Sequence, residues 1–322
     1  MTTAAIPIQS QTATTTAVQH AAPEGMWRQV LRSRRVLIGG GILFGILFLC
    51  LATLPWTLKS SSTFYYDYQD RSKLYQSSAW DVRSWFGYDQ LGRSILARCL
   101  LGGIISLAVG AAAATIAVVL GVTVGLLAGF RGGWVDSALM RVVDILYGLP
   151  YILLVILFKI AFENPLSRLV QPMWANIIVL FASIGLVSWL TMARVVRGQV
   201  LSLRGQPFIE ACRALGLKEG RIFLLHILPN LIGPITVYAT LTVPSAILQE
   251  SFLSFLGVGI NAPLPTWGSL ASDAVQQMSP IKLHWWLLVF PCTLLAVTLL
   301  SLNFMGDGLR DVFDPKKEAA KI

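Results

Sequence analysis

Six long stretches of the sequence contain no Asp, Glu, Lys or Arg, and they constrain the fold more than any other feature. They cover residues 36–58, 99–130, 145–158, 169–193, 222–249 and 283–306. An α-helix rises about 1.5 Å per residue, so about 20 apolar residues cross the roughly 30 Å hydrocarbon core of a bilayer. Five of the six stretches reach that length directly. Because 55% of the residues are hydrophobic and only 13% are charged, we predict an all-α integral membrane protein.

The third stretch is the short one, since Lys159 interrupts it early. Its length fits a re-entrant segment as well as a full span. A lysine at the rim of a span can extend its ammonium group to the interface, which lengthens the segment to Phe162. With six spans and both termini in the cytoplasm, most of the 25 Lys and Arg residues lie on the inside, whereas five spans would move the basic loop 194–221 outside. We therefore predict spans at about 36–58, 99–128, 145–162, 170–193, 227–249 and 284–306.

Small residues in the predicted spans have the spacing that lets two helices approach closely. Gly41 with Gly45 and Gly121 with Gly125 are four residues apart, as in small-xxx-small helix interfaces. We interpret these glycines as packing positions in a helix bundle.

The segments outside the spans are short or simple in composition. Residues 1–25 are rich in Thr, Ala and Gln, so we expect a disordered cytoplasmic N-terminus, followed by one membrane domain over 26–315 and a tail over 316–322. The net charge of +9 is scattered among short loops beside the spans. Such charges orient a chain in the bilayer, so we expect lipid contact and no nucleic-acid binding.

Catalytic motifs are missing from the sequence. It has no GxxxxGK[ST], no HExxH and no CxxC, and its three histidines are far apart. We therefore expect no catalytic residue, no metal site and no cofactor bound by this chain. The spans also lack an acid or histidine at mid-depth, which argues against an ion-coupled secondary transporter.

The basic loop 194–221 is predicted to contain an amphipathic helix over about 207–217. Pro207 suits the first helical turn, and Gly216 suits a left-handed C-terminal cap. Between them, apolar residues recur at helical spacing: Phe208, Ala211, Cys212 and Leu215. From this pattern alone, the helix could lie on the membrane surface or insert into the groove of a cytosolic partner.

Four ordered motifs resemble one known family. The segment Glu210-Ala-Cys-Arg-Ala-Leu-Gly216, followed by Ile227-Leu228-Pro229-Asn230, is similar to the EAA motif of ABC importer permeases, with Cys212 at the usual second alanine. The other three stretches resemble the second permease subunit of the dipeptide/oligopeptide/nickel type. They are Phe86-Gly-Tyr-Asp-Gln-Leu-Gly-Arg93, Ser254-Phe-Leu-Gly-Val-Gly259 with Pro265-Thr-Trp-Gly268, and Gly306-Asp-Gly-Leu-Arg-Asp311 ending in Asp314-Pro315.

The resemblance implies a type I ABC importer permease fold, with six transmembrane helices and a cytoplasmic coupling helix. It implies a second permease subunit, two cytosolic ABC ATPases that bind ATP and Mg, and an extracytoplasmic substrate-binding protein as partners. The chain would be a multi-pass protein of the bacterial cytoplasmic (inner) membrane and would form half of a translocation pathway. The implied cargo is a di- or oligopeptide, with nickel or another small solute as the alternative.

The resemblance also assigns roles to residues. Those that would couple the chain to the ATPases are Phe208, Glu210, Ala211, Cys212, Arg213, Ala214, Leu215, Gly216, Leu217 and Pro229. A pathway for peptides needs polar side chains inside or at the rims of the spans. Candidates for the pathway or its gates are Thr240, Thr242, Ser245, Glu250, Asn303 and Asp307.

Overall fold

The protein is known from a computed structural model, which describes residues 30–278 and 283–313. The predicted N-terminal segment 1–25 and C-terminal tail 316–322 lie outside the described residues. Within the described ranges the chain is almost entirely helical and contains no β-strand, only an isolated bridge between Tyr88 and Ser94. The prediction of an all-α protein is therefore confirmed.

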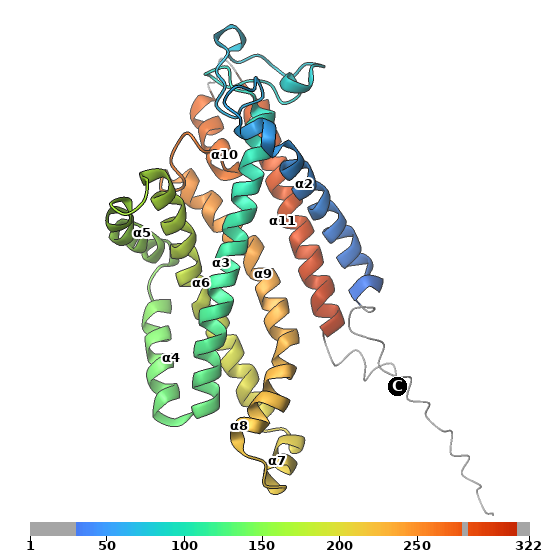
Figure 1. Ribbon diagram of the computed structural model, residues 1–322, viewed down its shortest axis with the longest axis vertical. Coiled ribbons are helices and arrows are strands. Elements are labelled where there is room, and N and C mark those ends of the chain that lie inside the picture. Colours follow the sequence, from blue (N-terminus) through green and yellow to red (C-terminus); the bar gives the residue numbers. More distant parts are fainter. Residues whose placement is uncertain (1–29, 279–282, 314–322) are drawn as a thin grey trace, which may run out of the picture.

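Five helices of the described chain are long and apolar enough to cross a membrane, and they run along the long axis of the molecule (Figure 1). They are α2 (Arg34–Leu58), α3 (Ile95–Arg131), α6 (Pro172–Arg204), α9 (Leu228–Phe255) and α11 (Trp286–Phe313). The shorter helices are α4 (Gly133–Tyr147), α5 (Tyr151–Ser167), α7 (Pro207–Ala214), α8 (Glu219–Ile222) and α10 (Trp267–Gln277). Single turns complete the list: η1 (Arg71–Lys73), η2 (Val82–Ser84) and the π-helical turn η3 (Phe223–Ile227).

The predicted third span over 145–162 is divided between two helices. Helices α4 and α5 are bent by 95° relative to each other. Only the two helices together are long and apolar enough to count as one span. The break falls at Gly148-Leu149-Pro150. Pro150 has no N–H to donate and disfavours helical geometry at the residue before it, so a helix entering from Tyr147 ends there. The predicted third span is therefore bent, and the pair of helices fits one broken span or a re-entrant segment.

Glycines bring α3 and α6 into close contact. A Cβ atom added to Gly125 would lie 2.6 Å from the Ala193 carbonyl oxygen, and one added to Gly121 would lie 2.5 Å from Met192 Cβ. The predicted packing role of this pair is therefore confirmed. The other pair, Gly41 and Gly45, faces open space, so our prediction was wrong there.

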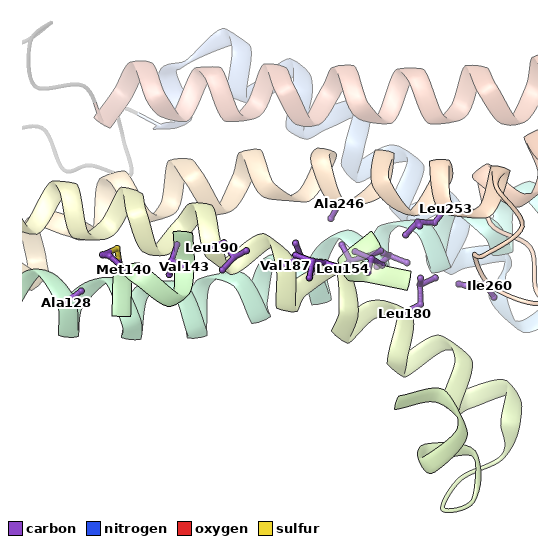
Figure 2. Close-up of a cluster of buried hydrophobic side chains, with 14 residues drawn as sticks. Ala128, Met140, Val143, Leu154, Leu180, Val187, Leu190, Ala246, Leu253 and Ile260 are labelled. Carbon is purple, nitrogen blue, oxygen red and sulfur yellow. The ribbon is translucent and has the colours of Figure 1, made fainter. Parts of the chain in front are cut away.

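The main hydrophobic core lies between α3, α4, α5, α6 and α9. Figure 2 shows its side chains as a row along the helix axes, from Ala128 and Met140 at one end to Leu180 and Ile260 at the other. A second buried cluster lies toward α7. We refer to it as the α7 cluster, and its members are Met192, Val196, Val200, Ile209, Ile222, Ile227 and Leu231.

The bundle has two different ends. Helices α7 and α8 lie at one end, and the segment 59–94 lies with α10 at the other (Figure 1). We call residues 59–94 the cap. The start of α2 and the end of α11 are joined by an ion pair of 2.8 Å between Arg35 and Asp311, on the side of the bundle opposite the cap.

Candidate functional site

Helix α7 has a well-defined end. Gly216 adopts a φ of +77°, a conformation that glycine reaches without steric cost. The Gly216 N–H donates to the Arg213 carbonyl at 2.9 Å, and the Leu217 N–H donates to the Cys212 carbonyl at 3.2 Å. This pair of bonds is a Schellman motif. The left-handed cap predicted at Gly216 is confirmed, and the chain direction after α7 depends on it.

The two faces of α7 differ from the predicted pattern. Ile209 is fully buried in the α7 cluster, and Cys212 packs against the same cluster. Phe208, Ala211 and Leu215 point away from the bundle, and Phe208 is 44% and Leu215 82% exposed. Cys212 therefore belongs to the anchoring face and not to the exposed stripe. We call Phe208, Ala211 and Leu215 the α7 stripe.

The remaining predicted coupling residues surround this stripe. Glu210 and Ala214 are exposed, Leu217 is half-buried against the α7 cluster, and Pro229 is exposed in the first turn of α9. A further residue, Glu219, links α7 to α8 because Arg213 Nε donates to its Oε1 at 2.7 Å. That hydrogen bond holds the pKa of Glu219 below its usual value.

Arginines of α6 fix this end of the bundle. Arg204 donates to two carbonyl oxygens in the last turn of α3, at 2.9 and 3.0 Å. Arg197 pairs with Asp136 at 2.5 and 2.7 Å, and Arg194 pairs with Asp144 at 2.8 Å. These contacts join α3, α4 and α6, so α7 follows a helix that is held to two others by its arginine side chains.

A cavity of about 540 Å³ lies between the α4–α5 break, α6 and α9. Two predicted pathway residues, Thr242 and Ser245, line it. Thr240 instead lines a separate hollow of about 420 Å³ between α3, α9 and α11. Asn303 and Asp307 are exposed on α11 and line neither space. The structure therefore brings only two of the six candidates together.

Glu250 does not lie at a solvated rim, as we expected. Helix α9 continues to Phe255, and Glu250 is fully buried within it. Its Oε1 accepts hydrogen bonds from Ser254 Oγ at 2.6 Å and from Thr266 Oγ1 at 2.9 Å. Because Thr266 caps α10, the carboxyl group ties the end of α9 to the start of α10.

The loop 256–266 between α9 and α10 is also held from its other side. Lys159 is buried, and its Nζ donates to the carbonyl oxygens of Val258 at 2.6 Å and Gly259 at 2.7 Å. Asn176 Oδ1 accepts from the Asn261 N–H at 3.1 Å. The expectation that Lys159 extends to the membrane interface is therefore wrong, because loop carbonyls bind its ammonium group inside the protein.

The cap contains a buried ion cluster around Asp89, which is 1% exposed. Asp89 Oδ1 accepts from the backbone N–H groups of Leu91 at 2.8 Å and Arg93 at 2.9 Å. Its Oδ2 accepts from Arg93 Nε at 2.7 Å and Arg98 at 3.0 Å, and Arg93 also reaches Asp67 at 3.1 Å. Burial lowers the pKa of Arg93, but the attraction of Asp89 and Asp67 outweighs it and the pKa is raised.

No group of three or more His, Cys, Asp or Glu side chains in residues 30–278 and 283–313 is arranged to hold a metal ion. The four cysteines are free thiols, two of them buried.

Comparisons with known proteins identify relatives of this chain. The sequence model of the family described as "Binding-protein-dependent transport system inner membrane component" matches residues 121–319. The chain is 38% identical to the oligopeptide transport system permease protein OppC of Haemophilus influenzae over 90% of its length and 89% of that protein. It is 40% identical to the dipeptide transport system permease protein DppC of Bacillus subtilis, over 90% and 84% of the two chains. It is 47% identical to OppC of Salmonella typhimurium, over 78% and 79%.

Among solved structures, a chain of the inward-facing MetNI methionine ABC transporter has the same fold. The TM-score is 0.52 at 22% identity, and the match covers 68% of this chain and 97% of that chain.

Proposed function

Because this chain belongs to the family of binding-protein-dependent transport system inner membrane components, we propose that it is a permease subunit of an ATP-driven importer of di- and oligopeptides. Relatives at 38–47% identity are named as oligopeptide or dipeptide permeases, which supports the peptide cargo. In this proposal the chain lies in the bacterial cytoplasmic membrane and pairs with a second permease subunit, two cytosolic ATPases and an extracytoplasmic binding protein.

The observation that carries the proposal is the α7 stripe. Leu215 is 82% exposed on a helix whose other face is anchored through Ile209. An apolar stripe on a short, anchored helix outside the bundle is suited to insertion into a groove of a partner. The stripe lies in the segment that resembles the EAA motif, so we assign the ATPase as that partner.

Coupling follows from how α7 is connected. Its anchoring face packs into the α7 cluster, and the neighbouring α6 binds α3 through Arg204. A displacement of α7 by the ATPases therefore moves α3 and α6, which carry the core. ATP shifts the transporter between states only through its different affinity for each, and that difference arises in the ATPases.

The topology of the proposal can be tested with single cysteines at Ser61 in the cap and Gln206 beside α7. A membrane-impermeant thiol reagent added outside intact cells should label the first position and not the second. External labelling at Gln206 would overturn the cytoplasmic placement of α7.

The docking of α7 can be tested with two leucines of equal exposure. Leu215 in the stripe and Leu169, between α5 and α6, are each 82% exposed. We expect Leu215→Glu to abolish co-purification of the ATPases and Leu169→Glu to retain it. Equal co-purification of both variants would show that the ATPases bind elsewhere.

The full function can be tested by reconstitution into vesicles. Concentrative peptide uptake should require this chain, its permease partner, both ATPases, the binding protein and internal ATP, each omitted in turn. Uptake by this chain alone, driven by an ion gradient, would refute the proposal and favour a secondary transporter.

A further inference from the structure

The cavity of about 540 Å³ has polar groups but no charged side chain in its lining. Arg194 is the cationic residue closest in sequence to the residues that line the cavity. It stacks on the Tyr147 ring at 4.0 Å and pairs with Asp144. Its charge is thus already compensated at the rim. A charged group that entered this space would lose hydration without gaining a countercharge, so the cavity is suited to a neutral polar group.

Three hydroxyl groups of the cavity present only acceptors. Thr242, Ser245 and Ser188 each donate to the carbonyl oxygen four residues earlier in their own helix, at 2.8, 3.1 and 2.8 Å. Each hydroxyl has one hydrogen to donate and two lone pairs. Because the hydrogens are used within the helices, only lone pairs remain for a bound molecule.

The Gln249 amide presents donors to the cavity, which the hydroxyl groups of Tyr147, Thr191 and Tyr238 also line. Tyr151 Oη donates to Gln249 Oε1, which joins α5 to α9 and fixes which way the amide of Gln249 points. The amide nitrogen of Gln249 has two N–H groups, and no described residue accepts a hydrogen bond from it. Donors at Gln249 therefore face the same space as the lone pairs of Ser245 and Thr242.

We infer that Gln249, oriented by Tyr151, binds the main-chain amide of the peptide during its passage. The Gln249 amide nitrogen donates to the peptide carbonyl oxygen, and the hydroxyl lone pairs on α9 accept from the peptide N–H. Every peptide bond offers this donor and acceptor, whatever its side chains, so the contact is independent of cargo sequence. This inference rests on the proposed function and assigns the chemical group that the pathway recognises.

The test compares tri-alanine with an analogue in which both peptide bonds are esters, which lack the N–H and are weaker acceptors. Uptake is measured in vesicles with the complete transporter and with the binding protein saturated by either compound, so that receptor affinity does not contribute. We expect the amide to be taken up about fivefold faster than the ester, the factor that one hydrogen bond of average strength provides.

The variants locate that preference in the cavity. Gln249→Leu should bring the amide-to-ester ratio close to one, and Tyr151→Phe should lower it. The matched control is Thr240→Val, which removes a hydroxyl from another face of α9 and should keep the ratio of the unaltered transporter. If Gln249→Leu does not assemble, Tyr151→Phe decides alone.

The failures of the two proposals are distinguishable. This inference alone would be overturned if Gln249→Leu takes up tri-alanine with an unchanged amide-to-ester ratio. Where only Tyr151→Phe assembles, an unchanged ratio in that variant has the same meaning. Equal uptake of amide and ester by the unaltered transporter would also overturn it. If the unaltered transporter takes up no tri-alanine, the proposed function falls, and this inference with it.

Discussion

The buried ion cluster of the cap allows a quantitative prediction for Asp89→Asn. The substitution keeps the shape of the side chain but removes the negative charge opposite Arg93 and Arg98, which are 7% and 4% exposed. Removing one partner of a buried ion pair costs about 3–5 kcal/mol. Arg93 retains Asp67 at 3.1 Å, so we take the lower end, about 3 kcal/mol. Such a loss favours local opening of the cap about 150-fold.

Cys99 reports an opening that moves the cap and α10 away from the start of α3, because it is 0% exposed and packs with Leu270 of α10 while Phe86 of the cap packs against the same cluster. We would measure maleimide labelling of Cys99 in a chain whose other cysteines are replaced, under conditions where opening is faster than labelling. Asp89→Asn should speed labelling about 150-fold. The control is Asp81→Asn, in the same cap, where the side chain is exposed and makes no capping bond. Equal labelling rates for the two variants would refute the reasoning.

Three further predictions concern the helices. Gly125→Leu should prevent assembly, because its Cβ would lie 2.6 Å from the Ala193 carbonyl oxygen; Gly41→Leu, which meets open space, should assemble normally on gel filtration. Gly216→Val forces a β-branched residue to a φ of +77° at a cost of about 1–2 kcal/mol; peptide uptake should fall while the isolated chain still inserts into membranes. Lys159→Met leaves two loop carbonyls without their donor, so protease should cut the loop 256–266 faster than in the unaltered chain.

Hydropathy located the long helices because lipid requires apolar side chains over a fixed length. It misplaced helix ends where charged residues have ion-pair or hydrogen-bond partners elsewhere in the protein. Helix α6 continues through Arg194 and Arg197 because α4 supplies Asp144 and Asp136. Helix α9 likewise continues past Glu250, whose oxygen accepts from Ser254 and Thr266. A charge in the sequence therefore does not by itself mark the end of a helix, and partners distant in sequence are invisible to the pattern.

The sequence predicted only part of the candidate site, because some of its residues act through contacts with elements distant in sequence. The cap of α7 was readable because Gly216 acts through local geometry. Ile209, the buried anchor, was missed because the apolar residues of so short a helix can be divided between its faces in more than one way. Gln249 gave no signal, since an uncharged side chain near the end of a span becomes noticeable only when the α4–α5 break places Tyr151 beside it.

The exposed α7 stripe bears on how a cell must produce this protein. In the proposed topology, a chain without its partner presents Leu215 and Phe208 to the cytosol at 82% and 44% exposure, and exposed apolar side chains invite aggregation and chaperone binding. With the proposed docking, the ATPases cover this surface as soon as they bind. Surplus copies keep it uncovered and are open to degradation. Quality control can therefore match the amount of permease to the amount of ATPase without a separate regulator.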